Sequence, residues 1–376
     1  MSTLTQNFAE KFEFTRWWQS IDRVILIALL CVILFGILLI FAASPAVATR
    51  INADKYHFVM MHLALLVPSL FGIYFVSHLD PRQIRIGALV LFPLFLAMTY
   101  ATKFLGVEIK GATRWIHLPG MSIQPSEFLK PVFAVVSAWL FAKGYEISRF
   151  PGKALAVGAY IVTVAALLLQ PDLGMSIVFT AIFGCQFFLA GLPIFFVAIM
   201  GGLGVVGLVA AYFIFPHVSS RIDRFLSPQA GDTYQIDRSL EAFLNGGWFG
   251  TGPGDGTVKR GLPDAHADFI FSVSGEELGL VWSALLLFLF MLIVLRGFSR
   301  ASQQKDMFVL LAVSGIMTQF GLQALINMGS ALHLIPTKGM TLPFVSYGGS
   351  SLLALALGMG TVLALTRRTN DAPYRP

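Results

Sequence analysis

The sequence contains little charge and almost no cysteine. Charged residues make up 12% of its 376 positions, and the two cysteines, Cys31 and Cys185, both lie inside apolar runs. This pattern predicts no disulfide and no redox role, and no spacing of cysteine and histidine predicts a metal site. The glycine-rich stretch over 246–256 is not followed by Gly-Lys-Ser or Gly-Lys-Thr, so it does not resemble a phosphate-binding P-loop.

Hydrophobic residues dominate the chain instead. They make up 56% of it, and the mean hydropathy is +0.75. No soluble core needs so much apolar surface, so the composition predicts an integral membrane protein. The formal net charge of +6 fits membrane orientation or contact with anionic lipid, and we expect no nucleic-acid partner.

Ten apolar runs are long enough to cross a bilayer as helices. They cover residues 23–43, 58–77, 85–102, 125–142, 154–169, 174–191, 194–215, 269–295, 307–328 and 345–366. We therefore predict an all-α polytopic membrane protein of about ten transmembrane helices, with one large external loop between spans seven and eight. The predicted domains are an N-terminal tail, a membrane domain that includes the loop at about 216–268, and a C-terminal tail, over residues 1–22, 23–366 and 367–376.

Two of these runs raise questions of their own. The first is long enough to span and follows a long polar segment that contains Trp17 and Trp18, so we interpret it as a membrane helix and not as a signal peptide. The fifth is short and ends at Gln170-Pro171-Asp172, and we expect it to be broken or re-entrant.

Lysine and arginine in short loops and tails orient the spans. One side carries Lys11, Arg16, Arg23, Arg82, Arg85, Lys143, Arg149, Lys153, Arg296, Arg300, Lys305, Arg367, Arg368 and Arg375. We assign this side, and with it both termini, to the cytoplasm. The two longer external loops also carry many cations, which suit an anionic ligand such as a phosphate at headgroup depth. Contact with lipid headgroups is the alternative.

The external stretch from Lys110 to Lys130 is dense in polar residues. Arg114 can grip a diphosphate through two parallel hydrogen bonds. Glu127 and Lys130 stand at helical spacing at the start of span four and can pair with each other. This pair either belongs to a substrate site or is a structural ion pair.

A second polar stretch, LPDAHADFIFSVSGEELGL over 262–280, passes directly into a membrane span. Charge near a bilayer is costly and is usually kept for function, so Asp268 is a candidate functional residue. A helix N-cap at the water interface is the alternative for Asp268. His266 either orients Asp268 or faces solvent. The acids Glu276 and Glu277 are expected within the first turns of the span.

The third polar stretch, TLPFVSYGGSS over 341–351, opens span ten. Ser346, Gly348 and Gly349 are candidates for substrate contact, with helix capping and close packing as the alternative. Polar residues spaced four apart on span nine, Gln319, Gln323 and Asn327, are expected to pack between helices. In the large loop, the spacing of Leu240, Phe243 and Leu244 predicts a short amphipathic helix at the membrane interface.

These features leave two classes of protein open. One is an enzyme that acts on a lipid-linked phosphate, and the other is a transporter or flippase for such a lipid. A transporter favours charge at the membrane midplane and repeated halves. Most of the charge here lies at the outer end of the spans, which favours the enzyme.

Six segments carry a resemblance to a known family. ATRWI, QPSEFLK, QPDLG, GGWFGTG, AHADFIFSVSGEELG and LPFVSYGGSS, in this order along nearly the whole chain, are similar to motifs of the SEDS (shape, elongation, division and sporulation) proteins, which are bacterial peptidoglycan glycosyltransferases. The form of the His-x-Asp-Phe-Ile-Phe motif, with Ala265 before the histidine, resembles the division branch more than the elongation branch. Departures from the family pattern are Thr113, Asp264 and Ala267.

The resemblance implies polymerisation of lipid II, the undecaprenyl-diphosphate-linked disaccharide pentapeptide, into β-1,4 glycan during septal wall synthesis. The donor sugar is α-linked, so the reaction inverts the anomeric centre. The resemblance places Asp268 at the acidic residue that is the family's proposed catalytic residue, where it would act as general base towards the acceptor 4-hydroxyl. Arg114, Lys130 or a divalent cation, Mg²⁺ or Mn²⁺, would offset the charge of the leaving diphosphate.

The resemblance also implies where the protein works and with what. The location is the bacterial cytoplasmic (inner) membrane at the division septum. The partners are the growing glycan strand, an FtsI-like class B penicillin-binding protein that supplies transpeptidation, and other divisome activators. Two alternatives stay open at this point, a lipid II flippase and a non-catalytic divisome scaffold.

Overall fold

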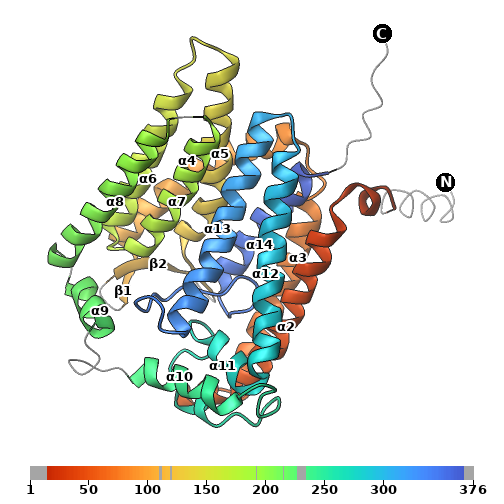
Figure 1. Ribbon diagram of the computed structural model, residues 1–376, viewed down its shortest axis with the longest axis vertical. Coiled ribbons are helices and arrows are strands. Elements are labelled where there is room, and N and C mark those ends of the chain that lie inside the picture. The colour runs from red at the N-terminus through yellow and green to blue at the C-terminus, as the bar shows by residue number, and fades with distance from the viewer. Residues whose placement is uncertain are drawn as a thin grey trace.

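The computed structural model is a bundle of long helices that run up and down between two ends (Figure 1). It describes residues 15–109, 112–118, 121–191, 193–214, 216–226 and 234–367. Among these residues, the predicted apolar runs form the helices α2 (Arg23–Ala48), α3 (His57–Val76), α4 (Pro81–Leu105), α5 (Pro125–Glu146), α6 (Gly152–Leu169), α7 (Leu173–Leu189), α8 (Ile194–Ile214), α12 (Gly279–Ser302), α13 (Met307–Ala331) and α14 (Gly349–Leu365). Within the described ranges, six of them meet a strict criterion of length and apolarity for crossing a membrane. The prediction of an all-α polytopic membrane protein is confirmed.

The eighth span differs from its prediction. Residues 269–295 do not form one helix, because α11 (Ile270–Glu277) ends before α12 begins at Gly279. Gly279 has φ +80°, and a Cβ there would lie 2.3 Å from the backbone nitrogen of Gly250. The glycine-rich loop packs its backbone directly against this junction, which only glycine permits. The acids Glu276 and Glu277 therefore precede the membrane helix instead of lying within it.

Two other boundaries differ from expectation. The fifth span is neither broken nor re-entrant, since α6 continues to Leu169 and a short turn leads to α7. Asp172 caps α7 by accepting a hydrogen bond from the backbone N–H of Met175 at 3.1 Å. The tenth span begins at Gly349, so residues 341–348 form a loop beside the helix ends.

The centre of the bundle is α5, which packs against α4, α6, α13 and α14. Its side chains are buried on nearly all sides, including Lys130, Phe133 and Phe141. The flanking helices α3 and α4 expose most of their apolar side chains, which suits contact with lipid. The polar side chains that α5 buries are thus shielded from the membrane by other helices.

At one end of the bundle, the loops fold into structure of their own (Figure 1). Strands β1 (Val107–Ile109), β2 (Ala112–Leu118) and β3 (Met121–Ile123) form an antiparallel sheet in the order β1-β2-β3, which the sequence analysis did not predict. The external loop forms α9 (Pro216–Leu226), α10 (Tyr234–Gly246) and the 3₁₀ helix η3 (Val258–Gly261). The predicted amphipathic helix is α10: Phe243 packs on Phe271 with ring centroids 5.5 Å apart, and Leu244 is exposed. Its place at a membrane interface stays a prediction.

The other end of the bundle, away from the sheet, carries basic residues that the sequence analysis assigned to the cytoplasmic side. Asp22 caps α2 and pairs with Arg296 at 3.0 Å and with Arg300. Arg367 donates a hydrogen bond to the carbonyl of Ser77. These contacts join the start of α2 to the end of α12, and the end of α14 to the end of α3.

Candidate functional site

A pocket of about 940 Å³ lies at the end of the bundle that carries the sheet. Its polar wall comes from segments far apart in the sequence and includes Arg114, Glu127, Asp172, His266, Asp268, Lys338, Gly348 and Gly349. Its apolar wall comes from α3, α5 and α14 through Met61, Leu65, Phe128 and Leu353. The pocket is therefore amphipathic, with ionisable groups beside a surface suited to a hydrocarbon chain.

The loop before α11 positions Asp268. Asp264 has φ +50°, and its carbonyl accepts hydrogen bonds from the N–H groups of Ala267 and Asp268 at 2.9 and 3.1 Å. Asn327 on α13 donates to the carbonyls of Asp268 and Met340 at 2.9 and 2.7 Å. Asp268 directly precedes Phe269, the N-cap of α11, and the alternative role of Asp268 as a helix cap stays open. Its half-buried side chain faces the pocket from a backbone fixed on both sides.

Gly339 lies directly against the Asp268 carboxyl group. A Cβ placed on Gly339 would be 2.9 Å from Oδ2 of Asp268. Lys338, the residue before Gly339, also lines the pocket, so this short segment contributes both a cation and the backbone beside Asp268.

His266 is held by aromatic packing. Its ring lies 4.1 Å from that of Phe58 and 5.5 Å from that of Tyr347, measured between centroids. Burial lowers the pKa of His266 to about 4, although the nearby charge of Asp264 acts in the opposite direction. The imidazole is therefore neutral at pH 7. Its proposed role in orienting Asp268 stays a prediction.

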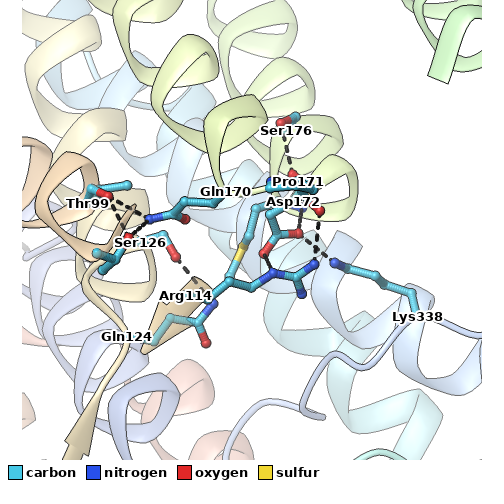
Figure 2. A network of polar contacts seen from close by, with 11 residues as sticks. Thr99, Arg114, Gln124, Ser126, Gln170, Pro171, Asp172, Ser176 and Lys338 are labelled. Atoms are coloured by element: carbon cyan, nitrogen blue, oxygen red, sulfur yellow. Dashed lines mark hydrogen bonds and ion pairs between the residues drawn. The ribbon is translucent and has the colours of Figure 1, made fainter. Parts of the chain in front are cut away.

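A cluster of charges not anticipated as a unit lies on the wall near Arg114. Arg114 Nε is 3.2 Å from Oδ2 of Asp172, and Lys338 Nζ is 2.6 Å from Oδ1. Figure 2 shows both cations converging on this carboxylate, with Arg114 also donating to the carbonyl of Pro171 at 3.0 Å. Burial alone would raise the pKa of Asp172, but the charges of Lys338 and Arg114 outweigh it and lower that pKa to about 2. We call these three residues the Asp172 cluster; it carries two cations for one carboxylate.

The predicted pair of Glu127 and Lys130 forms, but deeper than a substrate contact requires. Lys130 Nζ donates to Glu127 Oε2 at 2.8 Å and to Gln323 Oε1 at 2.9 Å, and Lys130 is fully buried. Glu127 reaches the pocket wall, whereas Lys130 lies behind it. The expected contact of Lys130 with substrate is therefore corrected to a supporting position, because its ammonium group is enclosed by its own partners.

Ser346 is also corrected. Its hydroxyl accepts from the N–H of Leu342 at 2.8 Å and donates to the carbonyl of Ala267 at 2.6 Å, so it ties the loop before α14 to the loop that carries Asp268. Gly348 and Gly349, in contrast, lie on the pocket wall. As predicted, Gln323 on α13 packs between helices. Its side chain forms hydrogen bonds with Lys130, Thr341 and Ser351.

The acids Glu276 and Glu277 organise the glycine-rich loop. Glu276 accepts hydrogen bonds from the N–H groups of Val258 and Lys259 at 2.7 and 2.8 Å, and from the side chain of Asn245 at 3.1 Å. Glu277 pairs with the Lys259 ammonium group. Both acids are buried, so their function is structural.

The side chains of the pocket do not form a metal cage by themselves. Among the described residues, no three His, Cys, Asp or Glu side chains come together as metal ligands. The carboxylates of Glu127 and Asp172 are already paired with cationic side chains. Among these residues, the expected divalent cation, Mg²⁺ or Mn²⁺, therefore does not fit a site built from protein side chains alone. Lys110 lies outside the described residues.

The fold and the pocket together define a multi-pass helical membrane protein with an acid and two cations gathered beside an apolar wall. The chain matches the family model FTSW_RODA_SPOVE, described as a cell cycle protein, over residues 22–371. It belongs to this family, which is the SEDS family that its motifs resemble.

Two curated relatives extend over nearly the whole chain. A protein of Caulobacter vibrioides (strain NA1000 / CB15N), named "Probable peptidoglycan glycosyltransferase FtsW", is 44% identical over 357 residues, covering 95% of this chain and 92% of the relative. A protein of Geobacter metallireducens (strain ATCC 53774 / DSM 7210 / GS-15) with the same name is 34% identical over 363 residues, covering 94% and 96%.

Two solved structures share the fold. One is described as the structural coordination of polymerization and crosslinking by a peptidoglycan synthase complex; its matching chain has a TM-score of 0.75 at 27% identity, covering 93% of this chain and 98% of that chain. The crystal structure of the rod shape determining protein RodA of Thermus thermophilus has a TM-score of 0.69 at 27% identity, covering 93% and 97%.

Proposed function

We propose that this chain is a peptidoglycan glycosyltransferase that polymerises lipid II during septal wall synthesis, with the pocket as its active site. The observation that carries the proposal is the placement of Asp268 beside Gly339, in one pocket with Lys338, Arg114 and an apolar wall. Such a pocket offers a base for an acceptor hydroxyl, cations for a diphosphate and a surface for a lipid chain. The names of the curated relatives support the same activity.

The reaction joins two sugars in one displacement. The 4-hydroxyl oxygen of the acceptor attacks the anomeric carbon of the donor, the bond from that carbon to the lipid diphosphate breaks, and the centre inverts to a β-1,4 linkage. Asp268 takes the hydroxyl proton, which requires its carboxylate within about 2.6–3.2 Å of that oxygen in the complex. The proton ends on Asp268, and the electron pair leaves with the diphosphate.

The leaving diphosphate gains negative charge as the bond breaks. Arg114 and Lys338 are the cations on the pocket wall, and Asp172 holds both of them in place. Fixed cations stabilise developing charge without having to reorganise during the reaction. We assign the diphosphate to this side of the pocket. Arg114 and Lys338 are the cations that would contact it, and Lys338 takes the place that the sequence analysis gave to Lys130.

The cellular setting is part of the proposal. We place the chain in the bacterial inner membrane at the division septum, with both termini in the cytoplasm and a class B penicillin-binding protein as partner. The solved synthase complex, described by its joint polymerization and crosslinking, supports a partner that performs the crosslinking. Contacts of basic residues at the end opposite the pocket support the orientation.

The test uses purified full-length chain with its penicillin-binding partner, lipid II and moenomycin, which silences polymerases of the other family. Glycan products of wild type and of Asp268→Asn are compared on a gel. We expect polymer from wild type and none from the folded variant.

Equal polymer from Asp268→Asn would refute the assignment of the base. If neither protein makes polymer, lipid II movement across vesicles is measured next, and movement without polymer would support a flippase. A scaffold would retain partner binding in both proteins and show neither activity.

A further inference from the structure

A second cavity, of about 690 Å³, lies at the same end of the bundle as the active-site pocket. One wall is the last half of α2, through Leu38, Phe41 and Pro45. The other side is formed by the chain that follows α2, by residues 253–260 and by the junction of α11 and α12. We call it the α2 cavity. It shares no lining residue with the active-site pocket.

The mouth of the α2 cavity is cationic. Four basic side chains line it, namely Arg50, Lys55, Lys259 and Arg260. The one acid in the lining is Glu277, which is already bound by Lys259 and by the N–H of Gly254 at 3.0 Å. Positive charge from Arg50, Lys55 and Arg260 is therefore left over within the lining.

The apolar wall of the cavity continues onto the lipid-facing surface of α2. Leu38 and Phe41 line the cavity and are still 54% and 44% exposed. In a membrane-spanning helix, side chains this exposed contact acyl chains. Arg50 and Lys55 follow the end of the same helix, where we expect the lipid headgroups, and Arg50 holds the carbonyl of Arg260 beside them. An apolar wall that runs up to a cationic mouth matches the shape and charge of one anionic lipid.

We propose that the α2 cavity binds an anionic phospholipid, with its phosphate at Arg50, Lys55 and Arg260 and an acyl chain along Leu38 and Phe41. The site is separate from the pocket that holds Asp268 and goes beyond the polymerase reaction.

The cavity is joined to the active site through the backbone. Arg50 donates hydrogen bonds to the carbonyl of Leu262 at 3.2 Å and to that of Arg260. A guanidinium group has five N–H donors, so a phosphate can bind Arg50 while these bonds persist. The segment that Arg50 holds leads within six residues to Asp268. A bound phospholipid therefore steadies the loop that carries the catalytic base, a consequence that rests on the proposed function.

The test measures lipid binding directly. Full-length chain is placed in nanodiscs of phosphatidylcholine that contain phosphatidylglycerol with a photoactivatable group in its acyl chain. We expect labelled peptides from residues 38–46, with labelling reduced about fivefold in Lys55→Gln and in Arg260→Gln. Lys103→Gln is the matched control, because this exposed lysine at the same end of the bundle does not line the cavity.

Three results would overturn the proposal. The first is equal labelling in all variants, and the second is equal labelling by photoactivatable phosphatidylcholine. The third is complete displacement of phosphatidylglycerol by an equimolar amount of undecaprenyl diphosphate, which would assign the cavity to a polyprenyl diphosphate. Asp268→Asn separates the two proposals, since it is expected to keep full labelling whether or not it polymerises lipid II.

Discussion

Two groups of acids and cations near the active-site pocket use the same ion-pair chemistry with different results. In the first group, Glu127 and Lys130 balance each other, and the ammonium group is sealed among its own partners. In the Asp172 cluster, two cations share one carboxylate, and all three residues reach the pocket wall.

The difference shows how charge balance separates structure from function in a membrane protein. A balanced pair in the interior joins helices and leaves nothing over for a ligand. A cluster of two cations and one carboxylate carries net positive charge on the pocket wall, which suits an incoming anion, and its carboxylate holds the cations in position. The comparison predicts that the first group governs stability and the second governs activity.

The largest effect is expected from breaking the balanced pair. Lys130→Met leaves the Glu127 carboxylate buried without its cation, which should lower the free energy of unfolding by about 3–5 kcal/mol. Glu127→Gln combined with Lys130→Met removes both charges and should recover most of that loss. Thermal unfolding in detergent, followed by tryptophan fluorescence, measures both. A stable Lys130→Met protein that has lost only polymerisation would instead return Lys130 to the substrate site.

The next largest effect concerns the unbalanced cluster. Lys338→Gln removes one of the two cations assigned to the leaving diphosphate, while Arg114 still pairs with Asp172. We expect polymerisation to fall by about 10²–10³-fold, the size seen when one stabilising donor is lost from a transition state. The free energy of unfolding should fall far less in Lys338→Gln than in Lys130→Met. Lys103→Gln serves as the control, and an equal loss of activity in both variants would contradict the assignment.

Gly339 offers a way to disturb the base without disturbing the fold. Gly339→Ala would place a methyl group 2.9 Å from Oδ2 of Asp268, and a carboxylate at the end of a side chain can move aside at little cost. Displacing the base from its reacting geometry should lower polymerisation by about tenfold, with unfolding nearly unchanged. Gly329→Ala, where the nearest atom is 3.4 Å away, is the matched control. Full activity of Gly339→Ala would show that the space at Gly339 does not determine the position of the Asp268 carboxylate.

The sequence predicted the membrane helices because each is a long apolar run, a signal that is local in the chain. It did not predict the break before Gly279, because that break depends on the backbone of Gly250 packing against it. The sheet of β1 to β3 was missed because its strands are only three to seven residues long.

The candidate site shows the same limit. Arg114, Glu127 and Asp268 could be found because each stands beside an apolar run. Lys338 lies in an ordinary polar linker, and its partner Asp172 is 166 positions away, so no spacing joins them. Spacing showed that Lys130 could pair with Glu127, but it could not show that the pair points its ammonium group away from the pocket.

His266 adds a third kind of charge environment to the comparison, a buried ionisable group that has no ion-pair partner among the described residues. Its predicted effect is the smallest of the four predicted for variants of this protein. Its pKa of about 4 lies below the ordinary value of 6.5, so between these values the unfolded chain binds more protons than the folded one. Stability should therefore fall as pH drops from 6.5 towards 4, by about 1 kcal/mol between pH 7.5 and 5.5.

His266→Phe keeps a ring between Phe58 and Tyr347 and removes the titrating group. We expect the midpoint temperature of thermal unfolding of this variant to match that of wild type at pH 7.5 and to be higher than that of wild type at pH 5.5. His117→Gln, a change at an exposed position on β2, should keep the pH dependence of wild type. If His266→Phe keeps it as well, the neutral ring at this position does not govern acid stability. Charge balance would then account only for the behaviour of the two ion-paired groups.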